Sequence, residues 1–133
     1  MAKWQRNKRV KSNSIEPDSR KDEIENLTAP DRLLEYFLDE IRKQLSGHLK
    51  QIILFGSRAR GDYFADSDYD FLAVVDFVSP EIREIVDEVA GKFLFQYNVV
   101  FSIFPISEEK YRKRIHEPFL RNIRKEGITF EIK

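Results

Sequence analysis

The segment GSRARGDYFADSDYDF, residues Gly56 to Phe71, lies between two apolar runs and combines glycines, arginines and acidic residues. Successive side chains of a strand point to opposite faces, so Asp68 and Asp70 are expected on the same side of a strand that begins here. Two carboxylates held in this way repel each other unless a cation lies between them. Magnesium is the natural cation because it takes hard oxygen ligands and shares its coordination with substrate phosphates. An Asp-X-Asp sequence alone, however, is more often a solvated turn.

The pair Gly56-Ser57 precedes these carboxylates at the end of an apolar run. A strand that ends in Gly-Ser and turns into a helix presents backbone N–H groups and a hydroxyl to an anion. Glycine also lets a phosphate approach the backbone without a Cβ in the way. Ser57 alone would more often be an ordinary helix cap. Together with the carboxylate pair, it predicts a site that holds both ends of a magnesium-nucleoside triphosphate.

Composition places this chain among single-domain proteins of the cytoplasm. Its 133 residues include no cysteine and carry a formal net charge of zero, and the absence of cysteine fits a reducing compartment. No apolar run approaches the roughly 18 to 20 residues that would span a membrane. Residues 1–27 are polar, basic and aperiodic, so we expect a flexible N-terminal arm followed by a folded domain over residues 28–133.

Hydrophobic periodicity within that domain predicts an α/β protein, with a small β-sheet of few strands flanked by helices. Helices are predicted from about residue 28 to 47, and over residues 79–95, 107–117 and 118–127. Strands are predicted over residues 51–55, 69–78 and 98–106, with a last short strand from residue 128.

The arrangement Gly56-Ser57, ten intervening residues, then Asp68-Tyr69-Asp70 resembles the signature of the minimal nucleotidyltransferase family, in the DNA polymerase β superfamily. The segments SEEKYRKR and PFLRNIRKEGI look like the closing segments of small bacterial and archaeal members. The resemblance therefore extends from residue 30 to about residue 130. It implies a polymerase β-like nucleotidyltransferase fold with a mixed sheet.

The resemblance also implies roles for particular residues. Asp68 and Asp70 would be the catalytic carboxylates and would bind magnesium. Five positions would contact the nucleotide: Gly56, Ser57, Arg58, Arg60 and Ser67. One of the two arginines could instead brace the loop against an acidic neighbour such as Asp62 or Asp66.

The reaction implied is transfer of a nucleoside monophosphate, most plausibly AMP from ATP, to an acceptor hydroxyl, with pyrophosphate leaving. Small stand-alone members resemble the antitoxin half of two-gene systems whose partner is a HEPN-type ribonuclease toxin. In those systems the antitoxin can transfer AMP to a tyrosine of the toxin. A nucleoside triphosphate and a HEPN-type protein are therefore the expected partners, and a homo-oligomer is also compatible with the sequence.

Active members of this family usually carry a third carboxylate on a neighbouring strand, and Val100 occupies that position here. Asp76 is six residues beyond Asp70, or about 20 Å along a strand, and cannot join the same cation site. Glu131, on the last short strand, is a conceivable but unsupported substitute. The missing acid leaves open a second function, an interaction module that binds nucleotide without turnover. A nucleic-acid binder that uses the basic arm is a third and less favoured alternative.

Overall fold

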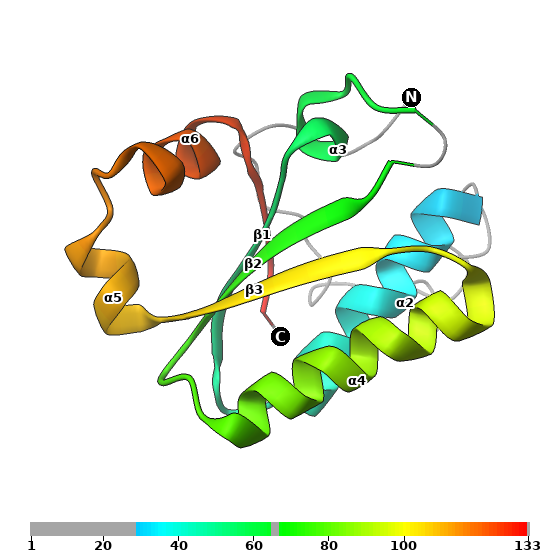
Figure 1. Ribbon diagram of the computed structural model, residues 1–133, viewed down its shortest axis with the longest axis horizontal. Coiled ribbons are helices and arrows are strands. Elements are labelled where there is room, and N and C mark those ends of the chain that lie inside the picture. Colours follow the sequence, from blue (N-terminus) through cyan, green and yellow to red (C-terminus); the bar gives the residue numbers. More distant parts are fainter. Residues whose placement is uncertain (1–28, 65–66, 133) are drawn as a thin grey trace.

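The computed structural model describes residues 29–64 and 67–132, so the predicted N-terminal arm lies outside the described residues. Figure 1 shows an α/β domain in which a twisted sheet lies between helices. The described helices are α2 (Ala29–Gln44), α3 (Ser57–Arg60), α4 (Pro80–Tyr97), α5 (Glu108–Lys113) and α6 (Pro118–Glu126). The described strands are β1 (Leu49–Phe55), β2 (Tyr69–Val75), β3 (Phe101–Ser107) and β4 (Ile128–Phe130).

The four strands form one mixed sheet in the order β3-β2-β1-β4. Strand β1 pairs antiparallel with both β2 and β4, whereas β2 and β3 are parallel. The end of β1 and the starts of β2 and β3 therefore meet at one edge of the sheet, which we call the β2 entry edge. The predicted class, a small mixed sheet flanked by helices, is confirmed.

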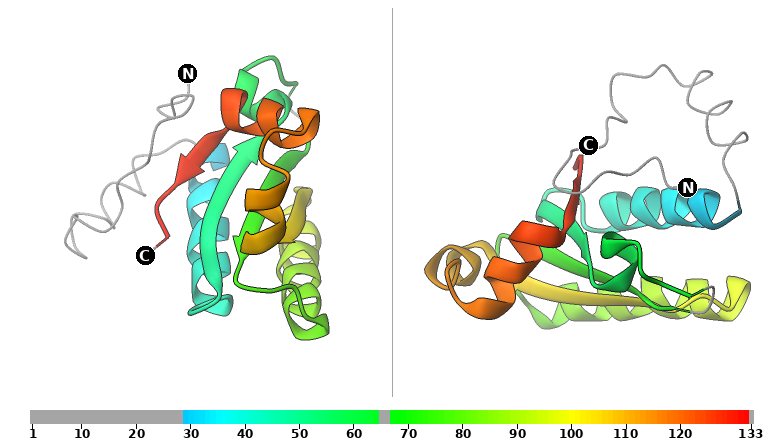
Figure 2. Two further views of the ribbon diagram at one scale, coloured as in Figure 1. Left: turned by 90° about the vertical axis from the view of Figure 1, so that its left-hand side faces the viewer. Right: turned by 90° about the horizontal axis from the view of Figure 1, so that it is seen from above.

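The main core lies between one face of the sheet and helices α2 and α4 (Figure 2). Helix α2 contributes apolar side chains at spacings of three and four residues, including Phe37, which is fully buried. The ring of Phe37 stacks on Phe101 of β3 with centroids 4.2 Å apart, and it also contacts Phe71 and Phe93. This aromatic cluster fixes α2 and α4 against the strands that begin at the β2 entry edge.

The opposite face of the sheet is covered only in part, by the short helices α5 and α6. Leu120 and Ile123 of α6 pack on Ile53, Leu72 and Val74, which point away from the main core. Phe119 of α6 contacts Phe55 at the end of β1 with ring centroids 5.7 Å apart, and Phe55 is the register partner of Asp70, the next outward-facing residue of β2. The carboxylate pair predicted from the sequence thus lies on the more open face.

Several element boundaries differ from the predicted ones for identifiable reasons. Strand β2 ends at Val75 rather than residue 78, and the next residue, Asp76, donates its amide to the carbonyl of His48 while its carboxylate binds the His48 ring at 2.9 Å. Helix α4 continues to Tyr97, where Asn98 ends it in the left-handed conformation. Helix α5 is shorter than predicted and ends at Lys113.

None of the described helices is both long and apolar enough to cross a lipid bilayer.

Candidate functional site

The carboxylates of Asp68 and Asp70 lie at the β2 entry edge, as predicted from their spacing. Between them, Tyr69 is buried in the main core and its ring contacts Phe101 with centroids 4.9 Å apart. Because side chains alternate along a strand, the two aspartates face the opposite, more open side. Burial raises the pKa of the Asp70 carboxyl above its ordinary value, and the negative charge of Asp68 raises it further. A bound cation would remove this repulsion.

The Gly56 backbone lies directly against one of these carboxylates. A Cβ built on Gly56 would lie 2.6 Å from Oδ2 of Asp70, which is closer than any real side chain approaches. Gly56 also has φ 78° and ψ −160°, a conformation that essentially only glycine adopts. The Gly-Ser turn and the Asp-X-Asp strand, twelve residues apart in sequence, therefore form a single site.

Helix α3 begins at Ser57, immediately after this contact. The carbonyl of Gly56 accepts hydrogen bonds from the amides of Ala59 and Arg60, so the turn is closed by backbone bonds rather than by a side-chain cap. Within residues 29–64 and 67–132, the Ser57 hydroxyl has no hydrogen-bond partner. The ordinary alternative for Ser57, a helix cap, does not apply, because Gly56 holds the cap position. The hydroxyl is therefore available to a ligand.

Arg58 braces the loop that returns from α3 to β2. Its Nε and one terminal nitrogen donate to the carbonyl of Ser67 at 3.2 and 3.1 Å. Its guanidinium also lies 4.3 Å from the ring centroids of both Tyr63 and Tyr69. A bracing role thus applies to Arg58 through a carbonyl and two aromatic rings. The predicted brace against Asp62 is made by the other arginine, Arg60.

Arg60 and Ser67 make more exposed contacts. Arg60 pairs with Asp62 at 3.3 Å and with Glu126 of α6 at 3.8 Å, which links the turn after β1 to the C-terminal helix. The hydroxyl of Ser67 accepts a hydrogen bond from the amide of Phe64 at 2.9 Å and so closes the return loop. Nucleotide contacts for these two residues stay a prediction.

Arg58→Lys is expected to lower the free energy of unfolding by about 1–2 kcal/mol, because lysine loses the stacking on two tyrosines and the paired hydrogen bonds to Ser67. Urea unfolding followed by circular dichroism measures this change. Arg60→Lys is the matched control, since its exposed ion pairs contribute less than about 0.5 kcal/mol. Equal losses in both variants would contradict the bracing role of Arg58.

The position expected for the missing acid is occupied by the apolar residue Val100, which immediately precedes β3. The carbonyl of Val100 accepts a hydrogen bond from the Tyr69 amide at 3.0 Å, and Phe101 is the register partner of Tyr69. Val100 therefore neighbours Asp68 on the open face, and 41% of its surface is exposed. A carboxylate at this position would face the aspartate pair, so the alignment inferred from the sequence is consistent with the observed register.

The other acids considered as substitutes lie elsewhere. Asp76 is at the opposite end of β2, bonded to His48. Glu131 follows a strand whose Phe130 pairs with Ile52, so it lies beyond the middle of β1 and away from the β2 entry edge. Glu131 therefore does not replace the missing acid. Among the described residues, no three His, Asp or Glu side chains come together in a group that could hold a metal ion.

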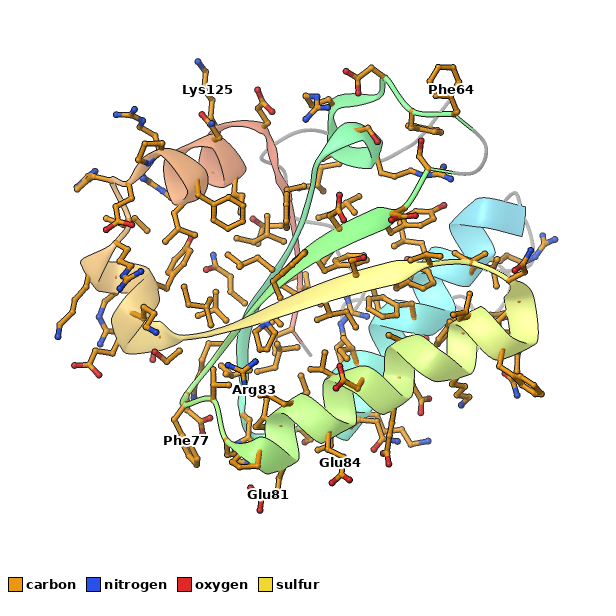
Figure 3. All side chains as sticks on the ribbon, viewed as in Figure 1. Phe64, Phe77, Glu81, Arg83, Glu84 and Lys125 are labelled. Carbon is orange, nitrogen blue, oxygen red and sulfur yellow. The ribbon has the colours of Figure 1, made fainter. Side chains whose placement is uncertain are left out.

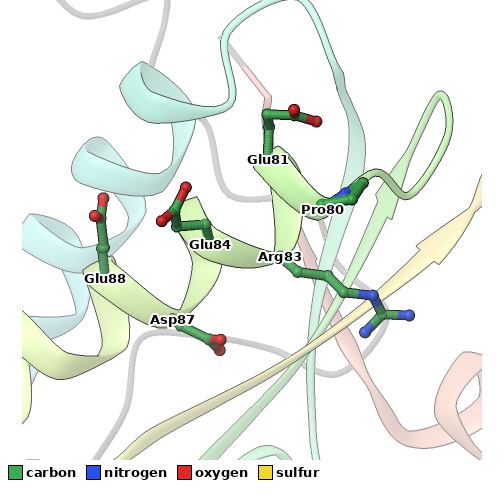
Figure 4. A pocket seen from close by; sticks show the side chains of 6 residues that line it. All are labelled: Pro80, Glu81, Arg83, Glu84, Asp87 and Glu88. Carbon is green, nitrogen blue, oxygen red and sulfur yellow. The ribbon is translucent and has the colours of Figure 1, made fainter.

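A surface depression along the first half of α4 does not belong to this site. Figure 4 shows its lining, which consists of Pro80, Glu81, Arg83, Glu84, Asp87 and Glu88. Four carboxylates against one guanidinium repel a polyphosphate. The depression also follows the end of β2, whereas the aspartate pair lies at its start. We therefore assign it no role in nucleotide binding.

Residues 34–128 match the family model described as the nucleotidyltransferase domain. The chain belongs to this family. The match includes the Gly-Ser turn, the carboxylate pair and strands β1, β2 and β3, and it confirms the resemblance stated on the sequence motifs. The general reaction of a nucleotidyltransferase, transfer of a nucleotidyl group, is thereby established for the chain as a family member.

Two curated relatives come from Methanocaldococcus jannaschii. The nucleotidyltransferase domain is 38% identical over 99 residues to "Putative protein adenylyltransferase MJ0604", covering 73% of this chain and 93% of the relative. It is 30% identical over 97 residues to "Putative protein adenylyltransferase MJ0141", covering 72% and 93% of the two chains. These relatives are thus of nearly the same length as the region they match.

Two solved structures are similar to this nucleotidyltransferase in part. One is titled "Crystal structure of the toxin-antitoxin with AMP-PNP", with 25% identity, a TM-score of 0.39, and coverage of 51% of this chain and 56% of the other. The second is a "putative nucleotidyltransferase from Sulfolobus solfataricus", with 21% identity, a TM-score of 0.37, and coverage of 69% and 85%.

Proposed function

We propose that this nucleotidyltransferase transfers AMP from magnesium-ATP to a hydroxyl group of a protein. The observation that carries the proposal is the contact between Gly56 and Asp70, because it joins an anion-binding turn to a carboxylate pair in one site. ATP as the donor also implies a location in the cytoplasm.

The residues of the site fit the two ends of the donor. The close approach at Gly56 leaves room for phosphate oxygens rather than a side chain, and the Ser57 hydroxyl is free to donate to them. Asp68 and Asp70 supply hard oxygen ligands, and the pKa of Asp70 is raised by its burial and by the negative charge of Asp68, both of which a bound cation would offset. When bound, divalent cations polarise the phosphates and activate the attacking oxygen.

The chemical step is a substitution at the α-phosphorus of ATP. A bond forms from the acceptor oxygen to this phosphorus while the bond to the bridging oxygen breaks, and pyrophosphate leaves. The acceptor hydroxyl loses its proton to water or to the carboxylate pair. Without an acid at Val100, Asp68 and Asp70 carry the carboxylate charge that the described residues bring to the site. We therefore expect turnover that is slow for the family.

Three observations favour a protein as the acceptor. Both curated relatives carry the name protein adenylyltransferase, and the matched region of this chain is too small to hold a second substrate-binding lobe. In addition, Leu94, Phe95 and Tyr97, which we call the α4 patch, expose 48%, 91% and 44% of their surfaces. This patch lies at the end of α4 that leads into the β2 entry edge (Figure 1). A HEPN-type toxin that offers a tyrosine is the narrower form of this proposal.

Labelled ATP tests the proposal directly. The protein, co-purified with its expressed partner, is incubated with Mg²⁺ and ATP labelled at either the α- or the γ-phosphate. Label retained on protein from α-labelled but not γ-labelled ATP would support nucleotidyl transfer and exclude phosphoryl transfer. Calorimetric titration with a non-hydrolysable ATP analogue runs in parallel. If no label were transferred to protein and the analogue did not bind, the proposed function would be overturned.

The valine at position 100 favours a second candidate, a nucleotide-binding interaction module that neutralises its partner by contact. In this case the analogue binds in a magnesium-dependent manner, yet no label is transferred. Both candidates need a partner surface, so the α4 patch serves either one.

Phe95→Glu is expected to weaken the complex with the partner at least tenfold, because Phe95 is almost fully exposed and is the most accessible large apolar residue of the α4 patch. The melting temperature should change little, since no core contact is lost. Affinity is measured by biolayer interferometry with the purified partner.

Phe77→Glu is the matched control, since Phe77 is 56% exposed but lies at the far end of β2 (Figure 3). Equal affinity for the Phe95→Glu and wild-type proteins would remove the α4 patch from the partner interface.

A further inference from the structure

We propose that the hydroxyl of Ser102 on β3 is an oxygen donor for a divalent cation, together with Asp70, in place of the third carboxylate. The inference deepens the proposed function and rests on it. It assigns to the cation site a residue that the sequence motifs did not single out.

The register of the two parallel strands brings these residues together. Asp70 and Ser102 are direct partners in the β2–β3 pairing, next to the pair formed by Tyr69 and Phe101. Since Tyr69 and Phe101 both point into the main core, Asp70 and Ser102 both point to the open face. A serine and an aspartate thus stand side by side where the cation is expected.

The separation of strands β2 and β3 allows one cation to contact both side chains. Neighbouring strands lie about 4.8 Å apart, and a magnesium ion binds oxygens at about 2.1 Å. An aspartate side chain reaches further from its Cβ than a serine does, so an ion between the strands can contact both oxygens. A hydroxyl is a recognised magnesium ligand, as in phosphate-binding loops where a Ser or Thr binds the ion.

The hydroxyl of Ser102 is also not otherwise engaged. Ser102 is half-buried, and in the described part of the chain its side chain makes no hydrogen bond. By contrast, the hydroxyls of Ser79 and Ser107 each accept a hydrogen bond from a helix amide. Val100, the other outward-facing residue at the start of β3, carries no oxygen on its side chain. Ser102 is therefore the side-chain oxygen of β3 nearest in register to Asp70.

Manganese affinity tests the inference without relying on catalysis. Free Mn²⁺ is followed by electron paramagnetic resonance while the ion is titrated into the full chain with a non-hydrolysable ATP analogue. Ser102→Ala is expected to weaken Mn²⁺ binding about tenfold. Ser102→Thr keeps the hydroxyl and should retain most of the affinity. Ser46→Ala makes the same chemical change on the exposed turn before β1 and should have no effect.

The outcomes separate this inference from the proposed function. Wild-type affinity in Ser102→Ala, with binding lost in Asp70→Asn, would overturn the role of Ser102 and leave the carboxylate site intact. No dependence of Mn²⁺ binding on Asp70 would instead overturn the proposed function. Loss of affinity in both Ser102→Ala and Ser102→Thr would indicate a packing role for Ser102 and would also overturn the inference. Far-UV circular dichroism verifies that each variant is folded.

Discussion

Replacement of Asp70 by asparagine is expected to reduce nucleotidyl transfer about a thousandfold or more, which corresponds to about 4 kcal/mol of transition-state stabilisation. The reason is that, within the part of the chain that the structure describes, Asp68 and Asp70 are the carboxylates of the candidate site and Val100 offers no further one. Asp68→Asn should have a loss of similar size. Initial rates with α-labelled ATP measure the effect. Asp76→Asn removes a carboxylate from the opposite end of β2 and should leave transfer unchanged.

Asp70→Asn, which should impair transfer, is not expected to impair the stability of the metal-free protein. The pKa of Asp70 is raised by burial and by Asp68, so the folded chain binds this proton more tightly than the unfolded chain does. The resulting stabilisation is fully present below the ordinary carboxyl pKa of 3.8 and is lost as the pH rises through the raised value. At neutral pH the ionised carboxylate therefore destabilises the metal-free fold.

Asp70→Asn removes this charge, so its melting temperature without Mg²⁺ at pH 7 should equal or exceed that of the wild-type protein. Added Mg²⁺ and the ATP analogue should stabilise the wild-type protein and not the variant. Thermal unfolding between pH 4 and pH 7 measures both effects. A variant that the cation still stabilises would show that Asp70 is not a ligand.

Gly56→Ala is expected to have the second largest effect, with a loss of about 2–4 kcal/mol in the free energy of unfolding and loss of cation binding. Two causes act together. The φ and ψ of Gly56 fall in a region that alanine rarely enters, and the new Cβ would lie 2.6 Å from Oδ2 of Asp70. The carboxylate must then move, which separates it from Asp68 and from the Gly-Ser turn.

Gly61→Ala is the matched control for the backbone strain. Gly61 ends α3 with φ 91° and ψ 2°, and a Cβ there would have no atom within 4 Å. It should lower stability by about 1 kcal/mol and leave cation binding intact. Chemical denaturation and Mn²⁺ titration of both variants provide the comparison. Equal losses of affinity would mean that the contact with Asp70 does not matter.

Much of the fold was predictable from local patterns. The apolar spacing in α2 and α4, with Ser79 and Pro80 at the start of α4, predicted both helices within a few residues. Boundaries that depend on distant partners were less accurate. Strand β2 ends at Val75, and the residue that follows it is held by His48, 28 residues away in sequence, which binds both the backbone and the carboxylate of Asp76.

The residues of the candidate site also divide into those predictable from local patterns and those that depend on contacts with distant residues. The alternation of side chains in a strand and the conformational freedom of glycine are local properties, so Asp68, Asp70 and Gly56 could be selected from their types and spacing. The sequence suggested that an arginine could brace the loop, but it did not show that Arg58 would pack on Tyr63 and Tyr69, because these residues become neighbours only when the return loop closes.

The sequence by itself thus determined the α/β class, the two functional segments of the site and the absence of a carboxylate at Val100. Only the tertiary structure decided that Gly56 lies against Asp70 and that Ser102 stands beside it on β3. The physical reason is that strand register between segments about 30 residues apart depends on the packing of Tyr69 and Phe101 into a shared core. No local propensity encodes that pairing.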